Sequence, residues 1–227
     1  MASIKGFITN LGKYNEGELV GEWIDFPIGE EELEEVKARI GINAEYEEFF
    51  FTDWELPEGM DWEIFGEYPS IDEVNDVAEK LESVDDEDVF AAILGEVGDI
   101  QEAIDIIDSG DYSVYPGVYD DSDLGYEVAE QLGELPKDTL EMYFDYEAFG
   151  RDIRSDLVNM AEEDEDQDLV DYYESQSDYD LGAEWVDDVG FDGVSNAGVY
   201  FDYEAFGRDV RLEGRFIEYS GGMIELY

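Results

Sequence analysis

The sequence predicts an α+β protein with an elongated, multi-module architecture. Three observations lead to this prediction: strand patterns occur near both ends, helical patterns fill the middle, and one ten-residue block occurs twice. Apolar residues form 44% of the 227 positions and aromatic residues 15%, which is enough to build hydrophobic cores although the formal net charge is −54. We therefore expect a folded chain and not a disordered acidic one.

Residues 1–68 are expected to form an N-terminal module of a small β-sheet and a helix. Residues 4–9, 19–28 and 48–56 have the composition of strands, and a glycine-containing loop separates the first two. Residues 30–41 place apolar side chains on one helical stripe and glutamates on another. One face of this helix should therefore pack on the sheet, and the other should be acidic.

Residues 69–110 are expected to form a central helical module. Ser70 and Glu73 have the spacing of a capping box, which marks the start of a helix. Two shorter helices are predicted over residues 85–94 and 99–107. The positions outside the apolar stripes are again rich in Asp and Glu.

A tandem duplication is the sharpest feature of the C-terminal part. The block YFDYEAFGRD occurs at residues 143–152 and, without a change, at residues 200–209, an offset of 57 residues. The same offset matches Asp121, Asp123, Leu124, Gly125, Glu127 and Gly133 to Asp178, Asp180, Leu181, Gly182, Glu184 and Gly190. Two related C-terminal units are therefore expected.

The first of these C-terminal units is predicted over residues 111–168 and the second over residues 169–227. The run AEEDEDQD at residues 161–168 has the composition of a solvated acidic linker. The end of the chain is predicted to be a β-hairpin that turns at residues 220–222. The C-terminal part is thus expected to be α+β.

Several kinds of chemistry are excluded or unsupported by the composition. Cys and His are absent, which excludes disulfides, thiol or imidazole catalysis and the usual zinc sites. The acidic loops at residues 120–125 and 178–182 lack the ligand spacing of an EF-hand. No nucleophile constellation or glycine-rich phosphate cradle is recognisable, so we expect no enzyme, no cofactor and no metal. Without a long apolar stretch, a cytoplasmic protein with no membrane contact is predicted.

The charge indicates a function. Duplex DNA carries one charge per roughly 1.7 Å, so this net charge corresponds to about 90 Å of duplex. An acidic surface repels nucleic acid and attracts the basic groove of a DNA-binding protein. We therefore predict a DNA mimic that competes for such a groove and binds no nucleic acid itself.

The carboxylates expected to imitate phosphates lie on the predicted helices, opposite or beside the apolar stripes. An ordinary solvated helix face is the alternative interpretation. The candidates are Glu31, Glu34, Glu35, Asp72, Asp76, Glu79, Asp85, Asp86, Glu87, Asp88, Asp105, Asp108, Glu127 and Glu130.

The repeated block is a candidate core or dimer interface, because Tyr and Phe in such blocks usually pack. The arginines in and beside it are expected to form internal ion pairs and subunit contacts, or else only to neutralise local repulsion. The candidates in the two copies are Tyr143, Phe144, Tyr146, Phe149 and Arg151, with Tyr200, Phe201, Tyr203, Phe206 and Arg208.

Two long segments carry a resemblance to a known family. The opening NLGKYNEGELVGEW, the block LGELPKDTLEMYFDYEAFGRD and the closing strands resemble the ArdA antirestriction proteins. The resemblance implies a curved homodimer of three-module chains whose carboxylates imitate the phosphates of bent B-form DNA. It implies an anti-defence protein of mobile genetic elements in the bacterial cytoplasm. Its implied partners are the methyltransferase and specificity subunits of type I restriction-modification enzymes, in which it would block both restriction and modification.

The second copy of the repeated block departs from the family pattern, since typical members carry the block once. This departure bears on the length of the decoy and on the dimer. A homodimer is expected because two-fold symmetry matches an enzyme that grips both halves of a split site. Alternatively, the extra unit supplies internally the contact that a partner chain would make.

Two other functions remain open from the sequence. A DNA mimic could instead target another methyltransferase-based defence system or a CRISPR effector. An acidic interaction protein from a halophile would share the high Asp and Glu content and the low Lys content.

Overall fold

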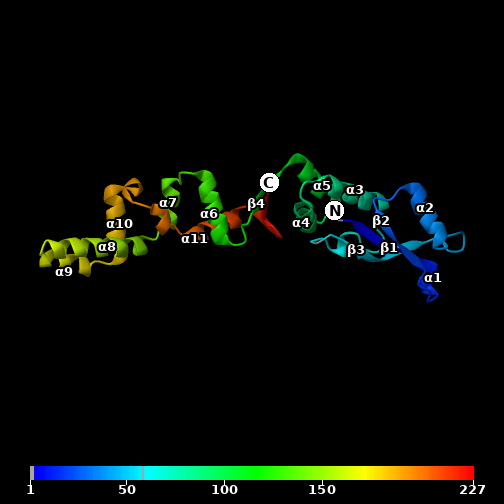
Figure 1. The fold of residues 1–227 in the computed structure, drawn as a ribbon, viewed down its shortest axis with the longest axis horizontal. Helices are drawn as coiled ribbons and strands as arrows, with labels where there is room; N and C mark the ends of the chain where they lie inside the picture. The colour runs from blue at the N-terminus through cyan, green and yellow to red at the C-terminus, as the bar shows by residue number, and fades with distance from the viewer. Residues whose placement is uncertain (1–2, 58) are drawn as a thin grey trace. The chain divides into compact units, whose positions relative to one another are not determined.

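The computed structural model describes residues 3–57 and 59–227, and it is α+β as expected. Within these residues it contains 11 α-helices and two three-stranded sheets. The chain divides into two compact units, which are Met1–Gly117 with Arg215–Tyr227 (unit 1) and Val118–Gly214 (unit 2) (Figure 1). The four modules expected from the sequence are a finer division and stay a prediction.

The first sheet of unit 1 is antiparallel and has β1 (Ile4–Asn10) at its centre, between β2 (Gly21–Phe26) and β3 (Phe49–Glu55). All three strands were predicted. Ile4 and Ile8 of β1 are fully buried because the central strand alternates its side chains into the core.

Two helices accompany this sheet. The loop expected after β1 begins with a short helix, α1 (Leu11–Asn15), because the Asn10 side chain accepts a hydrogen bond from the Lys13 amide and caps it. The predicted helix is α2 (Glu30–Arg39), which buries Leu33 and Val36.

Three further helices of unit 1 confirm the predicted helical segment. They are α3 (Ile71–Ser83), α4 (Glu87–Val97) and α5 (Ile100–Ser109), after the 3₁₀ turn η1 (Trp62–Ile64). Side chains at their starts accept amide hydrogen bonds, from Ser70, Asp86 and Asp99 respectively. Their apolar faces share one core with the first sheet.

The second sheet of unit 1 joins distant parts of the sequence. The predicted hairpin is confirmed as β5 (Arg215–Tyr219) and β6 (Gly222–Leu226). On its other side, β6 pairs antiparallel with β4 (Tyr112–Pro116), a strand that was not predicted. The chain therefore leaves unit 1 after β4 and returns to it at β5.

Unit 2 is helical throughout its described length. The segment from copy one contains α6 (Asp121–Leu132), α7 (Lys137–Tyr143) and α8 (Tyr146–Glu163). After α9 (Gln167–Ser175), copy two continues with α10 (Asp178–Val189), η2 (Phe191–Gly193), η3 (Ala197–Tyr200) and α11 (Tyr203–Glu213).

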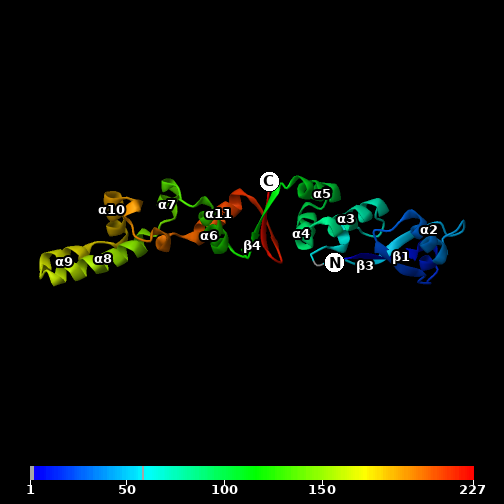
Figure 2. The same cartoon turned by 45° about the horizontal axis from the view of Figure 1, so that its top comes forward.

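The segment expected as an acidic linker, residues 161–168, differs from that expectation. Residues 161–163 end α8, and residues 167–168 begin α9, so only a short turn separates the helices. Ala161 is buried, and the Asp166 side chain caps α9 by accepting from the Leu169 amide. These local contacts favour a helical hairpin, in which α9 lies beside α8 (Figure 2).

Candidate functional site

The candidate carboxylates of α2 are exposed but partly neutralised. The Lys37 ammonium lies 2.8 Å from Glu34, and the Arg39 guanidinium lies 3.9 Å from Glu35. Arg39 also donates to Glu22 at 2.6 Å, and this hydrogen bond raises the pKa of the guanidinium above its usual value. Of the three candidates on α2, only Glu31 has no Lys or Arg nitrogen within 4 Å among the described residues.

The helices α3, α4 and α5 carry a different electrostatic environment. Lys80 is the single basic residue in the sequence between Asp61 and Glu134. Its ammonium lies 2.7 Å from the Asp108 carboxylate and thereby joins α3 to α5, while its side chain is only 15% exposed. The cation of this segment is therefore used inside the unit, and the other carboxylates stay uncompensated.

The exposed carboxylates of α3 illustrate this. Asp72, Asp76 and Glu79 follow one another at spacings of four and three residues, which places them along one side of the helix. Asp85 is exposed just before α4. Within the described part of the chain, these four side chains make no ion pair or hydrogen bond. We refer to these four residues as the α3 carboxylate row.

Other candidates have structural work. Asp86 accepts hydrogen bonds from the Asp88 and Val89 amides at the start of α4, and the Asp88 carboxylate accepts from the Ser220 hydroxyl at 2.7 Å. Asp105 accepts from Gln101. Glu87 is half-buried. Such carboxylates hold unit 1 together as well as contributing charge.

The candidates Glu127 and Glu130 belong to unit 2, on α6. Glu127 is half-buried and accepts from the Gln131 amide group at 3.1 Å. Glu130 is exposed and accepts from the Tyr126 hydroxyl at 3.4 Å. Both therefore lie in a different compact unit from the α3 carboxylate row.

The repeated blocks contact each other within the chain. Phe144 and Phe149 of the first copy are buried, as are Phe201 and Phe206 of the second. Phe144 forms an antiparallel β-bridge with Phe201, its own equivalent in the other copy. Four aromatic residues are half-buried around these rings: Tyr143, Tyr146, Tyr200 and Tyr203.

The arginines near the blocks form internal ion pairs, as one of the two interpretations expected. Arg154 lies 2.8 Å from Asp178, and Arg211 lies 3.4 Å from Asp121. The exposed Arg151 approaches Glu147 at 3.9 Å, and Arg208 lies 3.5 Å from Asp209. The subunit contact expected for these arginines stays a prediction.

The comparison with protein families decides the identity of the chain. A family profile described as antirestriction protein (ArdA) matches residues 6–164. The chain belongs to the ArdA family of antirestriction proteins. No curated protein matches it. The ArdA match contains the first repeated block and ends before the second, so the second copy lies outside the matched segment.

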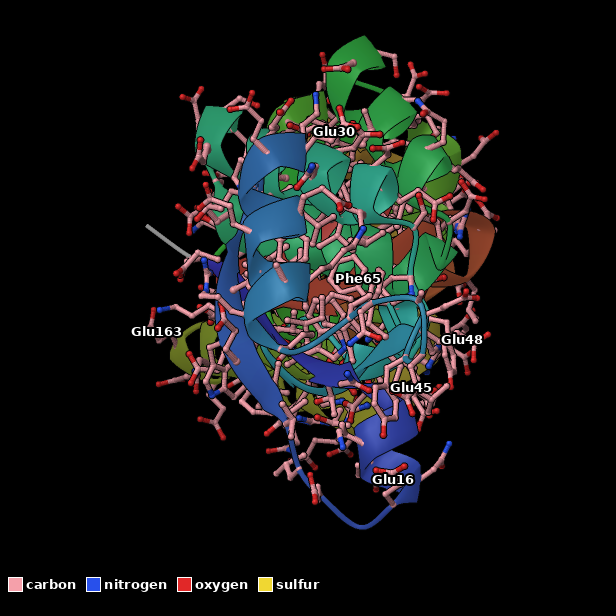
Figure 3. All side chains as sticks on the ribbon, turned by 90° about the vertical axis from the view of Figure 1, so that its right-hand side faces the viewer. Glu16, Glu30, Glu45, Glu48, Phe65 and Glu163 are labelled. Atoms are coloured by element: carbon pink, nitrogen blue, oxygen red, sulfur yellow. The ribbon has the colours of Figure 1, made fainter. Side chains whose placement is uncertain are left out.

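Sequence reasoning missed acidic residues of this ArdA chain that do not lie on an amphipathic stripe. The loop before β3 exposes Glu45, Glu47 and Glu48, and the turn between α8 and α9 exposes Glu163 and its neighbours. In Figure 3, Glu16 and Glu48 point outward, whereas Phe65 lies among the inner side chains of unit 1. The density of Glu in the sequence, without regard to periodicity, was the signal available for these positions.

The chemistry open to this ArdA chain is electrostatic. Within the described residues, no group of three or more carboxylates is arranged to hold a metal ion. No described helix is long and apolar enough to cross a bilayer. Exposed carboxylates on rigid helices can accept charge-assisted hydrogen bonds from Lys and Arg of a partner, as phosphate oxygens do.

Proposed function

We propose that this ArdA-family protein is a DNA mimic that occupies the DNA groove of type I restriction-modification enzymes and blocks restriction and modification. The observation that supports it most is the α3 carboxylate row, which is exposed and unpaired in a segment whose one lysine is engaged with Asp108. The methyltransferase and specificity subunits are the proposed partners. The protein acts by occupancy in the bacterial cytoplasm and catalyses no reaction.

The energy of such binding is distributed over many contacts. An exposed ion pair contributes only about 0–1 kcal/mol, so no single carboxylate should dominate. Many such pairs together give high affinity at low salt, and the affinity should fall steeply as salt rises. Because phosphate contacts carry no sequence information, the inhibitor should act regardless of the recognition site of the enzyme.

The decisive experiment measures DNA cleavage and methylation by two type I enzymes with unrelated recognition sequences. We expect the purified protein to inhibit both enzymes, and added non-specific duplex DNA to relieve the inhibition competitively. Inhibition of one enzyme alone, or inhibition that excess DNA does not relieve, would contradict the proposal. A lysate pull-down distinguishes another methyltransferase or a CRISPR effector as the target.

The halophilic alternative predicts a different response to salt. A halophilic interaction protein needs molar salt to fold, whereas a mimic folds in dilute buffer and loses its partner as salt rises. Circular dichroism between low and molar salt separates the two. The homodimer expected from the sequence is not carried into this proposal, because the blocks predicted for its interface contact each other within one chain.

A further inference from the structure

The helices of unit 2 pair across the two copies of the duplication. Under the offset of 57 residues, α6 corresponds to α10 and α8 corresponds to α11. In the structure α6 packs on α11, and α10 packs on α8. Each helix pair therefore takes one helix from each copy, and the two pairs are the same pair with the copies exchanged.

Glycines let these helices approach closely, and they do so twice. A Cβ on Gly125 of α6 would overlap the Tyr203 carbonyl oxygen, and one on its equivalent Gly182 would overlap the Tyr146 carbonyl oxygen. Gly207 and its equivalent Gly150 are equally close to the carbonyl oxygens of Asp121 and Asp178. Such backbone contact requires glycine on both helices and fits one specific partner helix.

The polar contacts repeat in the same crosswise way. The Asp145 amide donates to the Tyr200 carbonyl at 2.7 Å, and the Asp202 amide donates to the Tyr143 carbonyl at 2.7 Å. These two bonds exchange under the same offset. They flank the bridge between Phe144 and Phe201, which joins equivalent residues in antiparallel orientation, as happens at a two-fold axis.

Side chains extend this symmetry. The Tyr143 hydroxyl donates to Asp209 at 2.9 Å, and the Tyr200 hydroxyl donates to Asp152 at 2.8 Å. The two ion pairs of Arg154 and Arg211 with Asp178 and Asp121 are also equivalent. Each of the two apolar clusters likewise combines residues of both copies.

We propose that one copy of the duplicated segment is a self-association surface whose partner is a second copy, and that this chain closes the surface on itself. The second copy fills the position that a second chain with a single copy would take. The full chain is then a monomer, and a chain with one copy is a homodimer through the same contacts.

The connection between the copies favours closure within one chain. Only short turns separate α8 from α9 and α9 from α10, and α9 packs on α8. The second copy is thus held near the first at a high effective concentration, which an intermolecular partner at micromolar concentration does not match.

Two deletions of 57 residues test the proposal, each of which leaves one copy. Deleting residues 145–201 joins Phe144 to Asp202 and restores an unbroken YFDYEAFGRD block. Deleting residues 121–177 keeps α10 and α11 instead. Sedimentation or light scattering should give 25.9 kDa for the full chain at micromolar concentration and twice the chain mass for each deletion. The melting temperature of the deletions, but not of the full chain, should rise with concentration.

A matched pair of substitutions locates the dimer interface of the 145–201 deletion. Gly125→Ala should convert the dimer to monomer, because its Cβ meets the partner helix, whereas Gly29→Ala should leave the dimer intact, because a Cβ there meets nothing within 4 Å. A dimeric full chain, a folded monomeric deletion, or failure of both deletions to fold at any concentration would each overturn the proposal. These mass measurements do not depend on the proposed antirestriction function.

Discussion

Helices α3–α5 of unit 1 and the repeated blocks of unit 2 use carboxylates in opposite ways. Along α3 the carboxylates face solvent with one lysine nearby, and that lysine is held by Asp108. In unit 2, Asp121 and Asp178 face arginines, and Asp152 and Asp209 accept tyrosine hydroxyls. The comparison teaches that net charge alone does not assign a role to a carboxylate. Its partners do.

The largest effect is expected from the buried rings of unit 2. Phe149→Ala and Phe206→Ala each remove a ring that is less than 10% exposed, which should destabilise the protein by about 3–5 kcal/mol. Urea unfolding followed by circular dichroism measures this loss. Leu212→Ala is the control, because that side chain is 77% exposed and should change stability little. Equal losses in all three variants would contradict the packing described for these rings.

The next effect concerns binding through unit 1. Neutralising the α3 carboxylate row together, as Asp72→Asn, Asp76→Asn, Glu79→Gln and Asp85→Asn, should weaken inhibition by on the order of tenfold and flatten its salt dependence. Each single change should leave inhibition nearly intact. Inhibition titrations at several salt concentrations test this. If one neutralisation abolished binding in a folded protein, a hot-spot interface would replace the distributed mechanism.

A control for the row comes from a neighbouring carboxylate. Asp86→Ala removes the cap of α4 and should cost about 0.5–2 kcal/mol of stability, whereas Asp85→Ala should leave stability unchanged. Thermal melts of the two variants therefore separate structural from surface carboxylates two positions in the same loop. A similar loss in both would show that exposure is a poor guide to role here.

Much of unit 1 could be predicted because its signals are local. Ser70 and Asp99 marked helix starts by their spacing, and the hairpin turn followed from the Ser-Gly-Gly sequence. The strand β4 was missed because it has only five residues and ends in proline, so its pairing with β6 comes from distant sequence.

The crosswise pairing of unit 2 could not be predicted in the same way. The two blocks are identical in sequence, so each helix presents nearly the same surface, and local patterns cannot say which copy it will contact. The choice depends on the turn between α8 and α9, which was expected to be a linker. The sequence did indicate that the rings would pack and that the arginines would pair internally.

A smaller effect compares the two equivalent ion pairs of unit 2. Arg154 is 24% exposed and 2.8 Å from Asp178, whereas Arg211 is 37% exposed and 3.4 Å from Asp121. Arg154 also donates to the Gln176 carbonyl. Removing it leaves less hydrated groups unpaired, so Arg154→Met should cost about 1–3 kcal/mol and Arg211→Met less. Urea unfolding of both variants tests this order, and the reverse order would contradict it.

The smallest effect is expected from the two tyrosine hydroxyls that join the copies. Burial and the hydrogen bond to Asp209 raise the pKa of Tyr143 above its ordinary value of 10.0, and the hydrogen bond to Asp152 and burial raise that of Tyr200. A tyrosine whose folded pKa exceeds its unfolded value contributes stability that is fully present below the unfolded pKa. That contribution is lost as pH rises through the folded pKa.

Stability from these bonds should therefore be constant at neutral pH and decline in alkaline solution. Absorbance titration at alkaline pH measures the ionisation, and Asp209→Asn should lower the pKa of Tyr143 because a neutral acceptor no longer opposes the phenolate. Asp152→Asn should do the same for Tyr200. Because the two sites are equivalent in the duplication, the two variants should shift one tyrosine each in the same direction. A titration that neither variant changes would show that these hydrogen bonds do not form in solution, and it would weaken the symmetry on which the internal pairing of the copies rests.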